Sequence, residues 1–204
     1  MTETIQYKNG TYEGETLDGK RHGYGRYEWK DGSSYEGDFV HGRRSGKGIF
    51  TWSDGSFYQG DFLDDKRTGR GVFFRPDGNR YEGEFMEGRL TGVGAFYYAS
   101  GDRYEGSFED GVRAGFGIFT HAGGEKSVGC FVRGCREGTF TVLYPDGGVF
   151  VGEYRHDRRD GVGIYQRPDG MTEKQTWENG ILLSTRVIGL DETGETPTEE
   201  ESKT

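Results

Sequence analysis

The chain has 204 residues, of which 31% are hydrophobic, 15% are aromatic and 38 are glycine. Because aliphatic residues are scarce, this composition argues against a thick globular core and leaves phenylalanine and tyrosine to bury most of the apolar surface. A net charge of −9 argues against nucleic-acid binding, which needs basic surface to displace the counterions of phosphate.

Residues 1–11 precede the first repeat and contain an Asn9-Gly10 pair. This dipeptide is typical of a tight β-hairpin turn, so we expect a leading half-hairpin here. The segment lacks the apolar run of a secretory signal, and no part of the chain approaches the run of about 18 apolar residues that a membrane helix needs. We therefore expect a soluble, cytoplasmic protein.

From residue 12 to residue 184 the sequence repeats every 23 residues without insertion or deletion. A constant period predicts a solenoid-like array, in which each unit contacts its neighbours in the same way. We divide this region into seven full repeats and one degenerate repeat. The eight repeats begin at Tyr12, Tyr35, Tyr58, Tyr81, Tyr104, Ser127, Phe150 and Glu173.

Each unit has the pattern of a β-hairpin. In one of them, the β-rich runs 46–52 and 57–62 flank an Asp54-Gly55 turn. Alternation along a strand places Tyr35 and Phe39 on the same side, with a glycine between them. The sequence therefore predicts an all-β fold, an elongated single-layer antiparallel array of hairpin repeats.

One face of this array is predicted to be aromatic. A single layer cannot cover both of its faces, so part of the ring surface should remain accessible and bind a protein partner. The alternative is that the rings only form the core. The residues of this predicted aromatic face are Tyr12, Tyr35, Tyr58, Tyr81, Tyr104, Phe39, Phe62, Phe85 and Phe108.

Basic residues recur in the second loop of each repeat and should form a cationic ladder along one side. An extended anionic partner, such as a lipid surface or an acidic protein, could engage several rungs together. The favoured alternative is that the ladder pairs with Asp and Glu of adjacent repeats and keeps the array soluble. The ladder residues are Lys20, Arg21, Arg43, Arg44, Lys66, Arg67, Arg89 and Arg113.

No catalytic, cofactor or metal site is predicted. The histidines are expected to lie far apart along the array, and Cys130 and Cys135 have neither a zinc pattern nor a disulfide framework around them. The recurring Gly-x-Gly is not followed by a helix, as a phosphate-binding loop requires. We therefore expect a protein that is not an enzyme.

The C-terminal region differs from the repeats. Residues 181–190 are the only aliphatic-rich stretch, and we assign 185–190 as a cap that seals the last repeat. Dimerisation through this exposed end is the equal alternative. Residues 191–204, rich in Glu and Thr, are expected to be a disordered acidic tail.

The repeating unit, Tyr-Glu-Gly-Asp/Glu-Phe-x-x-Gly-Lys/Arg-Arg-x-Gly-x-Gly-x-Phe-x-x-x-Asp-Gly, resembles the MORN repeat (membrane occupation and recognition nexus). The sixth unit departs from it at Ser127 and Phe140, and the eighth keeps only Trp177 and Gly180. The resemblance implies a twisted antiparallel sheet and mostly architectural roles in cilia, flagella, parasite cytoskeleton and membrane junctions. A compact chain of such repeats is similar to radial-spoke-head proteins.

These inferences together predict a non-enzymatic scaffold in a cytoskeletal, ciliary or flagellar assembly. Its partners would be other proteins of that assembly, with self-association left open. The alternative function is a peripheral membrane or phosphoinositide-binding module that uses the cationic ladder. Neither function requires a cofactor or a nucleic acid.

Overall fold

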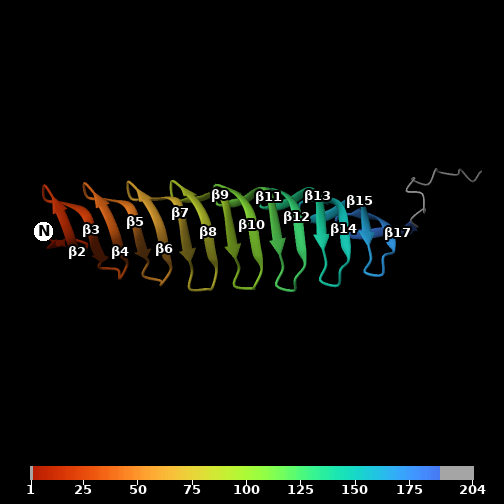
Figure 1. The fold of residues 1–204 in the computed structure, drawn as a ribbon, viewed down its shortest axis with the longest axis horizontal. Coiled ribbons are helices and arrows are strands. Elements are labelled where there is room, and N and C mark those ends of the chain that lie inside the picture. The colour runs from red at the N-terminus through yellow and green to blue at the C-terminus, as the bar shows by residue number, and fades with distance from the viewer. Residues whose placement is uncertain (1, 189–204) are drawn as a thin grey trace, which may run out of the picture. The chain divides into compact units, whose positions relative to one another are not determined.

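The computed structural model describes residues 2–188, which form β-strands and no helix. This confirms the predicted all-β class (Figure 1). The predicted tail, 191–204, and residues 189–190 of the predicted cap lie outside the described residues. The strands are β1 (Thr2–Tyr7), β2 (Gly10–Leu17), β3 (Lys20–Trp29), β4 (Ser34–Val40), β5 (Arg43–Thr51), β6 (Phe57–Leu63), β7 (Lys66–Phe74), β8 (Arg80–Met86), β9 (Arg89–Tyr97), β10 (Arg103–Glu109), β11 (Val112–Thr120), β12 (Lys126–Val132), β13 (Cys135–Leu143), β14 (Val149–Arg155), β15 (Arg158–Gln166), β16 (Thr172–Glu178) and β17 (Ile181–Ile188).

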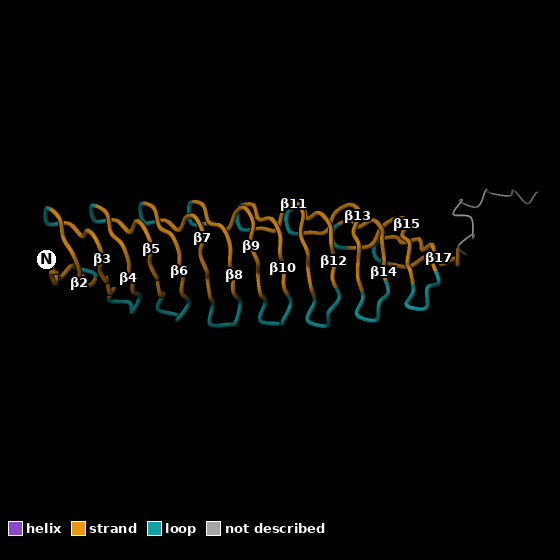
Figure 2. Tube along the Cα trace, in the orientation of Figure 1, coloured by secondary structure: helices purple, strands orange, loops and turns teal. Residues whose placement is uncertain are grey.

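The chain divides into two units, one of residues 2–122 and 131–134 and the other of residues 123–130 and 135–188. In the first unit, β1 to β11 each pair antiparallel with the strands before and after them in the chain. In the second unit, β13 to β17 do the same. Each unit is therefore an antiparallel meander of strands joined by short turns (Figure 2).

Two kinds of turn connect the strands, as the predicted Asp-Gly signals require. At Asp54-Gly55, the amide of Gly55 donates to the carbonyl of Trp52 at 3.0 Å, and Asp54 Oδ1 accepts from the amide of Ser56 at 2.9 Å. At the other end of the hairpin, Asp64 and Asp65 both have positive φ, 48° and 69°, as a two-residue type I′ turn demands. At the N-terminus Tyr7 pairs with Gly10, so that turn lies one residue earlier than the Asn9-Gly10 pair suggested.

A cross-strand pair of glycines marks the middle of each regular hairpin. In β6 and β7, Gly60 pairs with Gly71, and the ring of Tyr58 lies across them. A Cβ atom at Gly71 would stand only 2.5 Å from Tyr58 Oη. The hydroxyl donates to the carbonyl of Asp61 at 3.0 Å, which holds the ring flat against the strands. The glycines are thus required for the close approach of the ring.

Each hairpin also bends at a bulge beyond the glycine pair. In β5 the register shifts around Gly46, which has a φ of 109°, and Asp38 Oδ2 accepts from the amide of Lys47 at 2.9 Å. Arg44 pairs with Phe39 beyond this bulge, yet its guanidinium lies over Phe50, 5.0 Å from the ring centroid. The bent end of the hairpin therefore folds over the face that carries the rings.

The core of the first unit is a continuous file of aromatic rings. From the second repeat to the fifth, each tyrosine contacts one phenylalanine of its own repeat and one of the next, edge to face: Tyr35 lies 5.0 Å from Phe39 and 5.0 Å from Phe62. Tyr58 repeats this arrangement with Phe62 and Phe85. Edge-to-face pairs at this spacing are favoured by the ring quadrupole, so each repeat is joined to its neighbour by the same contact.

The C-terminal strand β17 pairs with β16. Residues 185–188 belong to this strand, and its Ile181, Leu183 and Val187 side chains are exposed. Capping and dimerisation therefore remain the two predictions for this strand.

Candidate partner-binding surfaces

The structure buries all nine side chains of the predicted aromatic face. Each of them is at most 6% exposed, because the bent hairpin ends cover the ring layer. Burial raises the pKa of Tyr58 and of Tyr81 to about 12. The expectation that these rings stay accessible is corrected, since their surface is used for packing and a partner must contact other residues. The buried residues are Tyr12, Tyr35, Tyr58, Tyr81, Tyr104, Phe39, Phe62, Phe85 and Phe108.

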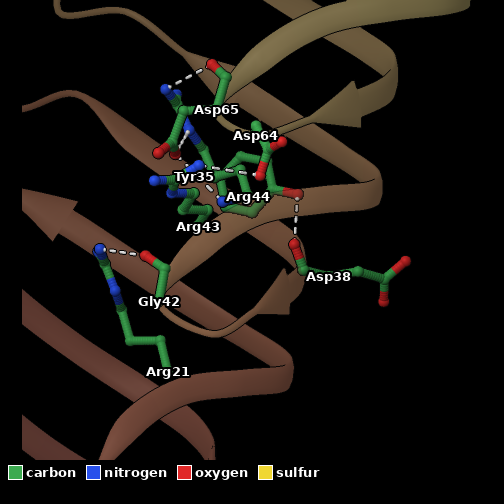
Figure 3. Close-up of polar contacts among 8 residues, drawn as sticks. All are labelled: Arg21, Tyr35, Asp38, Gly42, Arg43, Arg44, Asp64 and Asp65. Carbon is green, nitrogen blue, oxygen red and sulfur yellow. Dashed lines mark hydrogen bonds and ion pairs between the residues drawn. The ribbon is translucent and has the colours of Figure 1, made fainter.

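The cationic ladder separates into an inner and an outer row. The inner row is Arg21, Arg44, Arg67 and Arg113. Their guanidinium groups lie over aromatic rings and donate to carbonyl oxygens in the following turn, those of Gly42, Asp65, Gly88 and Gly134 respectively. Arg44, whose side chain is 20% exposed, also donates from Nε to Asp65 Oδ1 at 2.9 Å (Figure 3). Burial lowers the pKa of Arg67.

The outer row is Lys20, Arg43, Lys66 and Arg89, all exposed to solvent. Arg43 pairs with Asp64 at 3.2 Å, Lys66 pairs with Glu87, and Arg89 pairs with Asp110 at 3.0 Å. Each pair joins one repeat to the next, as the favoured alternative for the ladder predicted. Exposed pairs of this kind are worth only about 0–1 kcal/mol, but their carboxylates leave the outer row with little net positive charge.

The opposite face of the sheet carries the exposed apolar side chains of the first unit's hairpins. Val93 is 64% exposed and Phe116 60%, and Tyr24 and Ile49 occupy the same face. Tyr24 Oη donates to Glu36 Oε1 at 2.8 Å. Shallow hollows of about 410 and 450 Å³ lie on this face over the glycine pairs. Since the rings cover the inner side of those glycines, this outer face is the surface open to a partner.

The histidines and cysteines lie outside these rows. Within residues 2–188 no group of three or more His, Cys, Asp and Glu side chains could hold a metal ion. The histidines are less dispersed than expected: the ring of His22, in β3, lies 5.4 Å from the ring of His41, in the turn after β4. Cys130 is exposed and Cys135 half-buried. Among the described residues, no helix is long and apolar enough to span a membrane.

The family model described as MORN repeat matches residues 12–34, 35–57, 58–80, 81–103, 104–126 and 150–172, which together make up more than half of the chain. The chain belongs to the MORN-repeat family. MORN repeats are typical of protein-interaction scaffolds, and the matched segments have the 23-residue period found above. No curated protein matches the chain.

Two solved structures are similar to this MORN protein at low identity. The TCP domain of Drosophila melanogaster SAS-4 (dCPAP), in complex with a proline-rich motif of Ana2, is 14% identical over 71% of this chain and 85% of that one, with a TM-score of 0.40. The TCP10 domain of Danio rerio CPAP, in complex with a peptide of STIL, is 13% identical over 91% of this chain and 99% of that one, with a TM-score of 0.33. At these scores the likeness implies nothing about the function of this chain.

Residues 127–149 lie between matched MORN repeats and are not matched themselves. Here Ser127 stands in the tyrosine position and Phe140 in the position of the second glycine. The structure shows a reversed arrangement, in which the buried ring of Phe140 comes from β13 and faces Gly129 of β12. The hairpin is thus retained with the ring supplied from the other strand.

The inner arginine row is interrupted in one place that the sequence analysis did not single out. Leu90 occupies the position of Arg67 and Arg113, one repeat away on either side. A cavity of about 330 Å³ opens there, lined by Leu90, Phe73, Phe96 and several arginines. The sequence contained the signal for this cavity, because Leu90 departs from the arginine that recurs at this position of the 23-residue repeat.

Proposed function

We propose that this MORN protein is a non-enzymatic scaffold of a cytoskeletal, ciliary or flagellar assembly, located in the cytoplasm on such a structure. The observation that supports it is the open outer face, on which exposed apolar side chains such as Val93 and Phe116 stand at equivalent positions of successive repeats. A partner with a matching spacing gains affinity from several weak contacts made together. The cytoskeletal and ciliary location rests on the family resemblance.

The absence of catalysis is part of this proposal. The recurring carboxylates Glu36, Glu82 and Glu105 stand once per repeat on the sheet, whereas general acid–base chemistry needs groups that converge on one substrate. A scaffold needs only a rigid surface, which the file of buried rings supplies.

The test is partner capture that depends on the outer face. The full chain, tagged in source cells, is cross-linked and its partners are identified by mass spectrometry. The Val93→Ser, Phe116→Ser double variant should lose those partners and keep the thermal unfolding midpoint, since both side chains are exposed. Ala99→Ser, in the exposed turn between β9 and β10, is the control and should retain them. Equal capture by all three proteins would contradict the outer face as the binding surface.

Membrane binding through the cationic ladder is the competing function. Because Arg43, Lys66 and Arg89 are paired with carboxylates and the net charge is −9, we expect no sedimentation with phosphatidylserine or phosphoinositide vesicles at low salt. Salt-sensitive sedimentation that Arg43→Glu and Lys66→Glu abolish would instead support the membrane function.

A further inference from the structure

The cavity at Leu90 coincides with two linked departures from the repeat. Leu90 replaces the inner arginine, and Arg75 replaces the aromatic residue found at Trp52 in the preceding repeat. One period earlier the equivalent residues are in contact across two repeats, since the guanidinium of Arg67 lies 5.7 Å from the ring centroid of Trp52 in the repeat before it. Between the third and fourth repeats, Arg75 and Leu90 line an open cavity instead, and no guanidinium of residues 2–188 takes the place of the missing inner arginine.

The floor of this cavity is apolar. Phe73, Leu90 and Phe96 line it, and its volume is about 330 Å³. Elsewhere in the row the equivalent space is occupied by the stem and guanidinium of an arginine lying on the rings, as Arg113 lies on Phe119 at 5.2 Å. A large apolar side chain of another molecule could pack on this floor in the same way.

Arginines outnumber carboxylates in the lining of the cavity. Four arginines line it against one carboxylate, that of Asp110. Three of them make exposed ion pairs: Arg75 with Asp77 at 3.5 Å, Arg80 with Glu82 at 3.0 Å and Arg89 with Asp110. Such pairs exchange readily for another carboxylate, because each is weak and open to solvent.

The fourth arginine, Arg67, is the cation for which the described residues provide no carboxylate within 4.0 Å. Its guanidinium is half-buried between rings and donates to the carbonyl of Gly88 at 2.6 Å. A partly desolvated cation beside an open cavity attracts an anion more strongly than a fully hydrated one.

We propose that this cavity binds an acidic segment of a protein partner, which inserts one aromatic or large aliphatic side chain onto Phe73, Leu90 and Phe96 and turns an adjacent carboxylate toward Arg67 and Arg75. The inference rests on the proposed scaffold function and names the chemistry of one partner contact. A volume of about 330 Å³ suits one side chain with its neighbouring carboxylate. A short acidic segment meets only the arginine-rich lining, whereas an anionic bilayer also meets the surrounding surface of a chain whose net charge is −9.

The experiment uses the ¹⁵N-labelled full chain and the peptide acetyl-Glu-Asp-Phe-Glu-Glu-amide. NMR titration should shift the amides of Gly88, Leu90 and Gly111. Control peptides in which Phe becomes Ser, or in which the acidic residues become Lys, should bind at least about tenfold more weakly. No shift with the acidic peptide, or stronger binding of the basic one, overturns the proposal; the second result would mean that a partner's cation takes the vacant arginine position.

Two variants locate the contact. Arg75→Trp with Leu90→Arg introduces the residues of the preceding repeat, so it should fold, fill the cavity and weaken peptide binding at least about tenfold. Arg75→Gln, at an exposed position, should weaken it severalfold, while Arg70→Gln, equally exposed and outside the cavity, should not. If the double variant binds the peptide as tightly as the natural chain, the proposal is overturned. It is also overturned if phosphatidylserine vesicles shift the amide signals of Gly88, Leu90 and Gly111.

Failure of this inference is distinguishable from failure of the scaffold function. A cellular partner that binds the Arg75→Trp, Leu90→Arg variant as well as the natural chain leaves the scaffold function in place and removes the cavity from it. A chain that captures no partner loses the scaffold function, and the peptide titration then decides the cavity by itself.

Discussion

At the scale of single residues, the most demanding contact is a tyrosine ring lying on the backbone of two paired glycines. The ring of Tyr58 approaches Gly71 so closely that no side-chain atom fits between them. The tyrosine is useful there because its ring is apolar and its hydroxyl reaches the carbonyl of Asp61 at the edge of the core. The contact between the tyrosine ring and the paired glycines is therefore one structural feature that recurs along the chain.

Substitution of this glycine should be costly. Gly71→Ala places a Cβ 2.5 Å from Tyr58 Oη, so the ring must leave its position, and we expect a loss of about 1–3 kcal/mol in the free energy of unfolding. Denaturant unfolding measures it. Gly123→Ala is the matched control, because nothing lies within 4 Å of its Cβ and its φ is not positive. Equal stability of the two variants would show that the ring can move freely.

The buried tyrosines also predict an alkaline limit to stability. The unfolded chain ionises its tyrosines near pH 10, whereas burial raises the pKa of Tyr58 and Tyr81 to about 12. The unfolded state therefore releases protons first, and stability that is complete below pH 10 is lost as the pH rises from 10 to 12. Two pKa units correspond to at most about 2.7 kcal/mol per tyrosine.

Thermal unfolding between pH 8 and pH 11.5 checks this dependence. The natural chain should show a falling midpoint above pH 10. Tyr58→Phe with Tyr81→Phe should start lower, because two hydrogen bonds are lost, yet fall less steeply. Parallel curves for the two proteins would mean that other groups cause the alkaline loss.

At the scale of the element, the hairpin tolerates a ring from either strand as long as the facing position is a glycine. In the sixth repeat Phe140 faces Gly129, whose Cβ would lie 2.7 Å from the ring, and Ser127 is buried in the position of the tyrosine. The two departures from the MORN pattern therefore compensate each other. This explains how a repeat that the family model does not match still forms β12 and β13.

A double-mutant cycle tests this compensation. Ser127→Tyr alone adds a ring to a filled site and should cost about 1–3 kcal/mol or more. Phe140→Gly alone empties the site and should cost about 3–5 kcal/mol, as large-to-small core changes do. Combined, they restore the arrangement of the other repeats, and the double variant should be more stable than either single one. Additive losses would show that the two positions are independent.

At the scale of the whole molecule, the first unit is built from contacts between neighbouring repeats. Each tyrosine contacts a phenylalanine of the next repeat, and each inner arginine donates to the following turn. In such an array the free energy of unfolding is approximately the sum of the intrinsic stabilities of the repeats and the energies of the interfaces between adjacent repeats. One complete repeat should therefore be removable without loss of the fold.

Deletion of residues 58–80 removes one MORN repeat and leaves Phe57 followed by Tyr81, which preserves the pattern. We expect a cooperative unfolding transition and a β-type circular dichroism spectrum, with a modest fall in stability. Deletion of residues 58–69 breaks the period and should abolish that transition. An unfolded product from the complete deletion would contradict the nearest-neighbour account.

The sequence by itself determined the all-β class, the 23-residue repeat and the hairpin turns. These are local properties of the sequence. The Asp54-Gly55 pair strongly favours a tight turn. The alternation of side chains along a strand places Tyr35, Gly37 and Phe39 on one face, whatever the position of that strand in the sheet. The same alternation places Arg43 and Arg44 on opposite sides, so the division of the ladder into two rows was also accessible from the sequence.

Only the tertiary structure decided what covers the rings, because burial depends on how far each hairpin bends at its bulge. That bend turned the predicted aromatic binding face into a core and left the outer face exposed. It also brought the ring of His22 beside that of His41, and Arg75 to the same cavity as Leu90, although these residues are far apart in the sequence. Proximity across repeats follows from register and curvature, and neither is encoded in any one residue.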